Sequence, residues 1–267
     1  MSKSFYEILK ITEDGLNKIS DIAAVEEPLE ISVISKGVKK NISVTMRTPG
    51  NDDELAAGFL FTEGIIDTFE CIEKTVTADN NASIYIKENF EVNLNKIERN
   101  FYMTSSCGVC GKSSIDSVKI NSKYKPGIFK NIVAKQIVLS LPQILREHQN
   151  IFDSTGSLHA SGLFDYKGNF ITLKEDVGRH NALDKLAGYA LKNKMIPLKE
   201  NIILLSGRAS FELIQKASML GAPVVCAVGA PSSLAIDLAK ESNITLIGFL
   251  RDNRFNIYTY PERIELL

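Results

Sequence analysis

The chain has 267 residues, a formal net charge of -1 and 44% hydrophobic residues. This length favours two domains, and the composition supports a sizeable core. The charge balance argues against an overall attraction to nucleic acid or to an anionic membrane surface. No apolar run has signal-peptide length near the N-terminus, and none approaches the ~20 residues that span a bilayer. We therefore expect a cytoplasmic protein.

The first hundred residues have the pattern of a β-rich domain. Apolar and polar residues alternate in short runs, at 29–35, 40–48, 82–86 and 90–94. The first two runs flank a Lys36-Gly37 turn, which predicts a β-hairpin. After Pro49-Gly50, apolar residues recur at helical spacing, so we expect a helix capped by Asn51 or Asp52.

The second half alternates strands with helices. An expected hairpin at 159–176 is followed by continuous apolar strands at 202–206, 223–229 and 244–250. The predicted helices lie at 134–148, 181–194, 210–221 and 231–242, the last with Pro231 at its first position. Such short-range alternation predicts an α/β fold with a largely parallel sheet.

Two of the four cysteines form a Cys-x-x-Cys pair, Cys107 and Cys110, in the run TSSCGVCGKSS. A zinc site would need two more ligands, but Cys71 and Cys226 are single and distant. A thioredoxin-like dithiol would sit at a helix start, whereas this pair lies in a Gly/Ser-rich stretch. The remaining alternatives are two cysteines without a chemical role, or a thiol that carries sulfur as a persulfide.

The run LKEDVGRHNALDK places Arg179 and His180 at a strand-to-helix corner. Asp176 there can be a helix cap, and Arg179 can form an ordinary surface ion pair with the neighbouring carboxylates. In the functional interpretation, Arg179 and His180 provide positive charge for an anionic ligand.

Two further corners follow apolar strands, one at Ser206, Gly207 and Arg208 and the other at Gly229. Free N–H groups at such helix starts attract anions, and open α/β sheets bind ligands at the carboxyl ends of their strands. Either glycine can instead serve packing alone. Together the corners favour a phosphate-bearing ligand. The run FLRDNRF adds arginines after the last strand, which suit phosphate unless they are merely solvated.

Several of these stretches together resemble the FdhD family of formate dehydrogenase accessory proteins. They are TPGNDDELAAGFLFTEGII, SSCGVCGKSS, HASGLF, EDVGRHNALDK, SGRASFELIQKA and GAP, and the resemblance runs from about Glu27 to Arg263. It implies a sulfurtransferase that receives persulfide sulfur from a cysteine desulfurase. The sulfur then goes to the molybdenum cofactor, bis-molybdopterin guanine dinucleotide, for the formate dehydrogenase catalytic subunit.

The resemblance also implies roles for individual residues. Cys107 would be the persulfide carrier, while Cys110 would either resolve the persulfide or tune Cys107. The cofactor segment of the family falls on Phe249, Leu250, Arg251, Asp252, Asn253 and Arg254. With the corners above, the expected cofactor-binding set also includes Ser206, Gly207, Arg208, Arg179 and His180.

The implied architecture is α/β, with a cytidine-deaminase-like three-layer C-terminal domain and a β-rich N-terminal domain. We expect the N-terminal domain at 1–100, a mobile loop and linker at 101–133, and the cofactor-binding domain at 134–267, in a homodimer. No zinc is expected, because HASG has a histidine but no glutamate two residues later, and no second Cys-x-x-Cys follows. The alternatives are a non-catalytic carrier of the molybdenum cofactor, a dithiol oxidoreductase and a nucleotide-processing enzyme.

Overall fold

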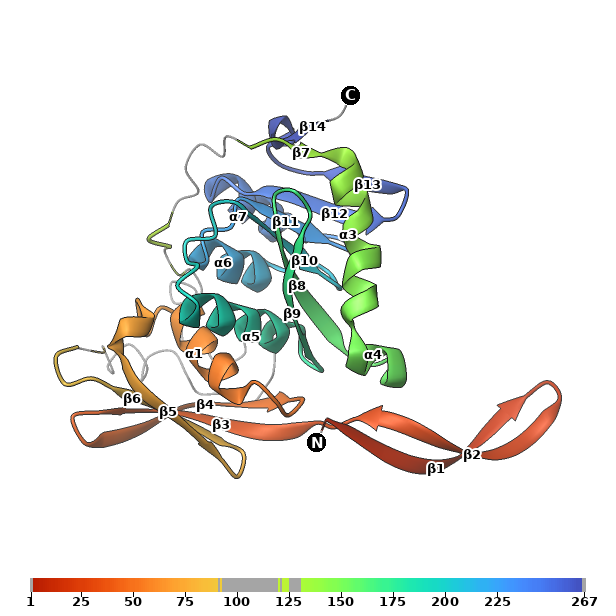
Figure 1. The fold of residues 1–267 in the computed structure, drawn as a ribbon, viewed down its shortest axis with the longest axis horizontal. Coiled ribbons are helices and arrows are strands. Elements are labelled where there is room, and N and C mark those ends of the chain that lie inside the picture. The colour runs from red at the N-terminus through yellow and green to blue at the C-terminus, as the bar shows by residue number, and fades with distance from the viewer. Residues whose placement is uncertain (1, 91, 93–119, 121, 125–130, 266–267) are drawn as a thin grey trace.

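A six-stranded mixed sheet forms the centre of the molecule (Figure 1). The computed structural model describes residues 2–90, 92, 120, 122–124 and 131–265. The strands are, in sheet order, β13 (Arg254–Ile257), β12 (Thr245–Arg251), β11 (Val224–Ala227), β10 (Asn201–Leu205), β8 (His159–Asp165) and β9 (Phe170–Asp176). In this sheet β10, β11 and β12 run parallel, whereas β8 is antiparallel to both β9 and β10, and β13 is antiparallel to β12. The α/β class is confirmed, but the sheet is mixed rather than largely parallel.

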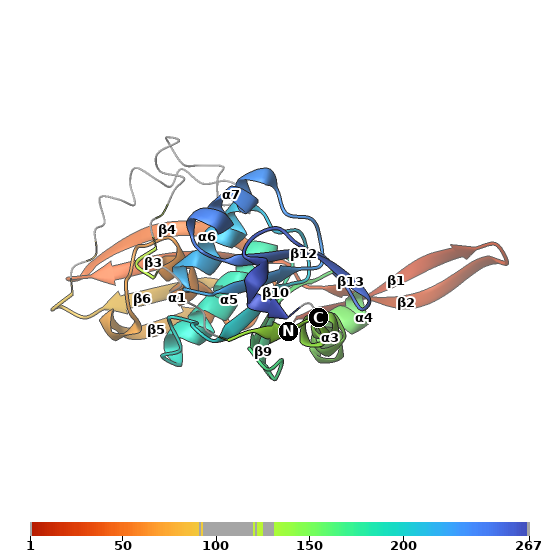
Figure 2. The ribbon, with the colours of Figure 1, turned by 90° about the horizontal axis from the view of Figure 1, so that it is seen from above.

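Helices cover both faces of this sheet (Figures 1 and 2). One face carries α3 (Lys135–His148), which leads into α4 (Asn150–Thr155); the other carries α5 (Arg179–Lys192), α6 (Phe211–Met219) and α7 (Ser233–Glu241). Alternate residues of β10 show this division, since Ile202 packs with the α3 side and Ile203 with the α5 side. The sheet is therefore the middle of three layers. Its likeness to cytidine deaminases stays a prediction.

A second sheet, of order β4-β3-β6-β5, forms the N-terminal part. Its strands are β3 (Glu27–Ser35), β4 (Val38–Arg47), β5 (Ile72–Ala78) and β6 (Asn81–Ile86). The predicted β3–β4 hairpin is confirmed, and its turn residues Lys36 and Gly37 both have positive φ, as a two-residue hairpin turn requires. The strand predicted at 90–94 lies largely outside the described residues, and Phe90 itself is not in a strand.

One predicted helix start and one predicted helix cap need correction. The helix α7 begins at Ser233 rather than Pro231, because the Ser232 hydroxyl accepts a hydrogen bond from the Ala235 N–H at 3.2 Å and caps the helix. The helix α1 (Asp52–Thr62) begins where expected, but the Asn51 side chain makes no capping hydrogen bond. Asp52 instead pairs with Arg47 at the end of β4, at 2.9 Å.

Helices α1 and α5 join the two sheets through one continuous core, which includes Leu55, Leu60, Leu183 and Leu186. They cross at a contact between two glycines. A Cβ on Gly58 would lie 1.9 Å from the backbone oxygen of Asp184, and one on Gly188 would lie 1.9 Å from that of Glu54. Backbone therefore packs directly on backbone here. The domain boundary predicted at residue 100 falls outside the described residues.

Three smaller features complete the fold. A hairpin of β1 (Lys3–Thr12) and β2 (Gly15–Ala24), which the sequence analysis did not predict, projects away from the body (Figures 1 and 2). Short strands β7 (Val133–Ala134) and β14 (Ile264–Glu265) pair in parallel. The 3-10 turns η1 (Phe69–Cys71) and η3 (Pro261–Arg263) precede β5 and β14. Among the helices in the described ranges, none has the length and apolarity to cross a membrane.

We predict that Gly188→Ala lowers the free energy of unfolding by about 3 kcal/mol, because the added methyl group forces two backbones apart. Gly37→Ala is the control. Its added methyl group meets open space, so only the left-handed backbone conformation costs free energy, about 1 kcal/mol. Urea unfolding of both variants measures the difference, and equal losses would contradict the close α1–α5 contact.

Candidate functional site

The sequence-predicted corners lie at one edge of the central sheet. The parallel strands β10, β11 and β12 all end at this edge. Because β8 runs antiparallel to β10, its first residue His159 lies there too, opposite Asp176 at the end of β9. The structure therefore brings together, as expected, the residues that follow β9 and β10 and those that end β12: Arg179, His180, Ser206, Gly207, Arg208 and Phe249–Arg251.

Two glycines allow the corners to approach one another. A Cβ on Gly207 would lie 3.3 Å from Nδ1 of His159, and one on Gly229 would lie 2.9 Å from Cα of Arg208. The Gly229 N–H also donates to the Gly207 carbonyl at 2.8 Å. The Ser206 hydroxyl accepts the Ala160 N–H at 2.8 Å, so it joins β8 to β10.

The segment 249–254 forms the end of β12 and its turn into β13. Phe249 has a φ of 53° and is 43% exposed, whereas the Leu250 side chain is fully buried. Arg251 donates through Nη1 to the Val228 carbonyl at 2.6 Å. Asp252 and Asn253 make the turn, which places Arg254 opposite Arg251. Leu250 can therefore meet a ligand only through its backbone.

Two of the helices that start at this edge have no side-chain cap. Gly178 precedes α5 and Ser210 precedes α6, and neither provides a capping hydrogen bond. Among the described residues, the buried Ser210 hydroxyl and the buried Nε of Arg179 have no hydrogen-bond partner. Uncapped helix starts leave N–H donors and a partial positive charge, so they suit an anion.

The two histidines at this edge lie beside charged groups. Burial, and next the charge of Arg179, lower the pKa of His159 below its ordinary value, which keeps its imidazole neutral at pH 7. His180 is nearly buried, with Nε2 lying 3.9 Å from a carboxylate oxygen of Glu212 on α6. The sequence analysis does not include His159 among the site residues. The predicted hairpin at 159–176 could have indicated it, because the ends of that hairpin place His159 opposite Asp176.

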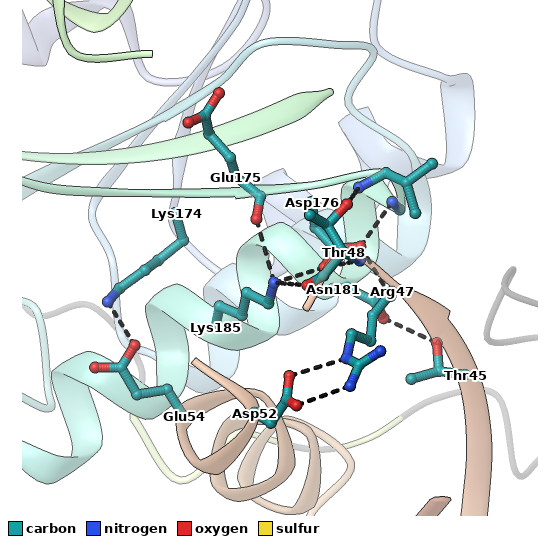
Figure 3. A network of polar contacts seen from close by, with 12 residues as sticks. Thr45, Arg47, Thr48, Asp52, Glu54, Lys174, Glu175, Asp176, Asn181 and Lys185 are labelled. Atoms are coloured by element: carbon teal, nitrogen blue, oxygen red, sulfur yellow. Dashed lines mark hydrogen bonds and ion pairs between the residues drawn. The ribbon is translucent and has the colours of Figure 1, made fainter. Parts of the chain in front are cut away.

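A buried ion pair holds this edge to the N-terminal part (Figure 3). Asp176 is fully buried and lies 2.7 Å from Nζ of Lys185, which is 2% exposed. Thr48 N–H donates at 3.1 Å to Oδ2, the oxygen that pairs with Lys185, and Gly178 N–H donates to Oδ1 at 2.8 Å. Asn181 Nδ2 donates to the same carboxylate at 3.1 Å. Much of EDVGRHNALDK is therefore structural.

The neighbouring Glu175 is also engaged. Its carboxylate accepts the backbone N–H groups of Ile151 and Phe152 at 3.1 and 2.9 Å, at the start of α4. An Arg179 ion pair with Glu175 and Asp176, one of the sequence-based alternatives, is not formed, because both carboxylates have other partners.

A second buried cluster positions α6. Lys216 lies 2.9 Å from Asp184 on α5 and 3.0 Å from Glu63 just after α1, and it donates to the Thr62 hydroxyl at 2.9 Å. The helices α5 and α6 are therefore both fixed to α1 by buried charges, with their uncapped starts side by side at the sheet edge.

A cavity of about 400 Å³ opens next to the edge on the α3 side. His159, Ser206 and Val228 line it from the sheet, and Arg146 and Phe152 line it from the helices. Its size is that of a small-molecule site. Phe152 and Arg146 thus give the cavity an aromatic and cationic wall beside the turns that follow β10 and β11.

The two sequence-predicted thiols, Cys107 and Cys110, lie outside the described residues. Burial raises the pKa of the Cys71 thiol to about 11 and raises that of Cys226 still further. Neither is a thiolate at neutral pH, so neither is a nucleophile. In the part of the chain that the structure describes, no three His, Cys, Asp or Glu side chains gather as metal ligands would.

The sequence model of the FdhD/NarQ family matches residues 24–265, and the chain belongs to this family. The sulfur carrier protein FdhD of Picrophilus torridus is 48% identical over 248 residues, which cover 92% of this chain and 93% of the relative. The protein of the same name from Streptomyces coelicolor is 43% identical over 271 residues, covering 97% and 95%. The family resemblance is confirmed.

A solved structure has the same fold. A Desulfotalea psychrophila protein, assigned as a formate dehydrogenase accessory protein, superposes with a TM-score of 0.76 at 23% identity. The match covers 99% of this chain and all of that one. The likeness therefore extends over the N-terminal and α/β parts together.

We predict that Lys185→Met lowers the free energy of unfolding by about 3–5 kcal/mol, because it leaves the Asp176 carboxylate buried without its partner. The double variant Asp176→Asn/Lys185→Met should recover a large part of this loss. Lys192→Met is the control: its ion pair with Asp53 is exposed, so its loss should cost less than about 1 kcal/mol. Chemical unfolding of the unmodified protein, Asp176→Asn, Lys185→Met, the double variant and the control measures the coupling, and additive losses from the two single substitutions would contradict it.

Proposed function

We propose that the protein is a sulfurtransferase that serves a formate dehydrogenase. Cys107 accepts sulfur from a cysteine desulfurase and delivers it to the molybdenum cofactor, bis-molybdopterin guanine dinucleotide, which binds as a substrate. Membership of a family whose curated relatives are named sulfur carrier proteins supports the sulfur step. The observation that carries the cofactor step is the pair of uncapped helix starts at an arginine-rich sheet edge.

The sulfur chemistry needs two thiols. The Cys107 thiolate attacks the terminal sulfur of the desulfurase persulfide, and the desulfurase thiolate leaves. Cys110 then attacks Sγ of Cys107, which breaks the S–S bond and releases sulfide as a disulfide forms. The sulfur leaves as hydrosulfide, which with one proton would replace an oxo ligand of the substrate's molybdenum as water leaves, and two equivalents of a cellular thiol reduce the disulfide. Cys71 and Cys226 do not compete, because their buried thiols stay protonated.

The cofactor phosphates need donors at the edge. In this proposal, the N–H groups that start α5 and α6 bind a phosphate between them, and Arg179 and Arg208 add charge. The exposed ring of Phe249 offers a surface on which the guanine base can stack. Arg251 and Arg254, opposite each other on the β12–β13 hairpin, complete the positive rim.

The rival function is a non-catalytic carrier of the molybdenum cofactor. It would use the same sheet edge without either thiol. A Cys107→Ala/Cys110→Ala variant separates the two functions, because a carrier would still activate formate dehydrogenase and a sulfurtransferase would not.

We predict a mass increase of ~32 Da on the Cys107 peptide after incubation with a cysteine desulfurase and cysteine, as expected for one added sulfur. Peptide mass spectrometry under non-reducing conditions measures it. Cys107→Ala should abolish the addition, and Cys71→Ala should leave it unchanged. An addition that appears on Cys71 or Cys226 instead would contradict the assignment.

We predict that Arg208→Ala weakens guanosine diphosphate binding by about tenfold, because it removes a charge-assisted hydrogen bond to phosphate. Isothermal titration measures the affinity. Arg146→Ala is the control, since Arg146 lies across the cavity on α3 and pairs with Asp153 at 3.0 Å. Equal affinities of the Arg208 variant and the unmodified protein would contradict the placement of the phosphates. This binding test does not involve the thiols, so it can fail independently of the sulfur step.

A further inference from the structure

The cavity on the α3 side of the sheet has no part in the proposed phosphate contacts. Its volume of about 400 Å³ lies near the lower end of the ~300–1,000 Å³ range of small-molecule sites. It therefore suits a ligand much smaller than a dinucleotide. Much of its wall is apolar, with Pro142, Leu145, Leu158 and Val228 in the lining.

The sheet separates this cavity from the phosphate corners. Along β8, Ala160 packs in the core on the α3 side and Leu163 packs in the core on the α5 side. Because successive residues of a strand alternate between the two faces, the His159 side chain lies on the α5 side, against Gly207. Ser206 and Val228 line the cavity from the opposite face. The cavity is therefore a second site and not an extension of the first.

One polar side chain in the cavity wall is buried and unused. Gln149 joins α3 to α4 and is only 5% exposed. Within the part of the chain that the structure describes, its carboxamide makes no hydrogen bond, and it does not cap α4. A buried amide without a partner costs free energy. Since Gln149 lines the cavity, a ligand there can provide the missing partners.

The other polar groups of the wall are neutral or already paired. The Ser206 hydroxyl accepts the Ala160 N–H at 2.8 Å, so its own O–H remains available to donate. Arg146 pairs with Asp153 at 3.0 Å and lies over the Phe152 ring, 4.3 Å from its centroid. Among the described residues that line the cavity there is no carboxylate. A charged ligand would therefore lose its hydration without gaining an unpaired counter-charge.

We propose that this cavity binds an uncharged, flat heteroaromatic ring that carries a hydrogen-bond donor beside an acceptor, the pattern at the edge of purine bases and pterins. The Gln149 carboxamide presents an acceptor next to a donor, so it pairs with such an edge through two hydrogen bonds. The wall of Phe152 and Arg146 provides the surface on which the ring stacks. The Ser206 hydroxyl donates a further hydrogen bond. This second site depends on neither the sulfur step nor the phosphate contacts.

The test is the binding of free pterin, which is uncharged at pH 7 and has no phosphate, followed by its own fluorescence. We expect saturable binding of one pterin per chain. Gln149→Met should weaken it about tenfold, because this substitution keeps the bulk of the side chain but removes two hydrogen bonds. Phe152→Leu should weaken it about fivefold through the loss of stacking.

The matched control is Gln143→Met. Gln143 lies exposed on α3, where its amide donates to Glu147 at 3.0 Å, and it is not in the cavity lining. This variant should bind pterin as the unmodified protein does. Thermal unfolding checks that all three variants remain folded.

Two further titrations identify the source of the ring. Guanosine takes the place of pterin in the first, and the tighter ligand of the two shows whether the cavity prefers a purine or a pterin. In the second, guanosine diphosphate is added to the pterin-loaded protein. We expect both ligands to bind together, and Gln149→Met to leave the affinity for guanosine diphosphate unchanged.

The proposal is overturned if neither pterin nor guanosine binds the unmodified protein. Binding that Gln149→Met and Phe152→Leu both leave unchanged also overturns it, because the ring would then lie elsewhere. Displacement of pterin by guanosine diphosphate overturns the separation of the two sites. A failure of the proposed function is distinct from these outcomes, because Arg208→Ala and Cys107→Ala report it.

Discussion

The buried ion pair between Asp176 and Lys185 is the interaction on which the candidate site depends. Removing both charges from water is costly, and the cost is offset only because each group is surrounded by partners. Asp176 ends β9 and accepts N–H groups from Thr48 and Gly178, while Lys185 donates to the Thr48 carbonyl at 2.8 Å. One ion pair therefore fixes the sheet edge, the start of α5 and the N-terminal part together.

This arrangement leaves the donors at the sheet edge rigid and unused. The Lys216 cluster holds α6 to α5 and α1, so both uncapped helix starts keep their positions before any ligand arrives. Preorganised donors favour binding, because little ordering remains to be done when an anion docks. The reactive chemistry is separate from this frame, since the two thiols within the described residues are buried and inert. In the proposed function, the starts of α5 and α6 would hold the cofactor, and the Cys107 thiol would deliver the sulfur.

Local pattern was sufficient to predict most of the fold. The strands and helices from β8 to β12 follow from apolar runs and periodicity. Because parallel strands end at the same edge of a sheet, the sequence also predicts that Arg179, Arg208 and Arg251 lie at one edge. Asp176 and Lys185 lie in one run of sequence, but their burial against the N-terminal part was not predicted, because Thr48 lies 128 residues away from Asp176 and no local pattern reports such a contact. The β1–β2 hairpin was missed because its apolar residues face no core of their own chain, and the structure describes neither Cys107 nor Cys110.

The most direct test of the central claim is a crystal structure of the protein with guanosine diphosphate. The account predicts phosphate oxygens within about 3 Å of backbone N–H groups at the start of α5 or α6, with Arg179 or Arg208 alongside. Phosphates that lie instead on the α3 side of the sheet, or away from the central sheet altogether, would contradict it.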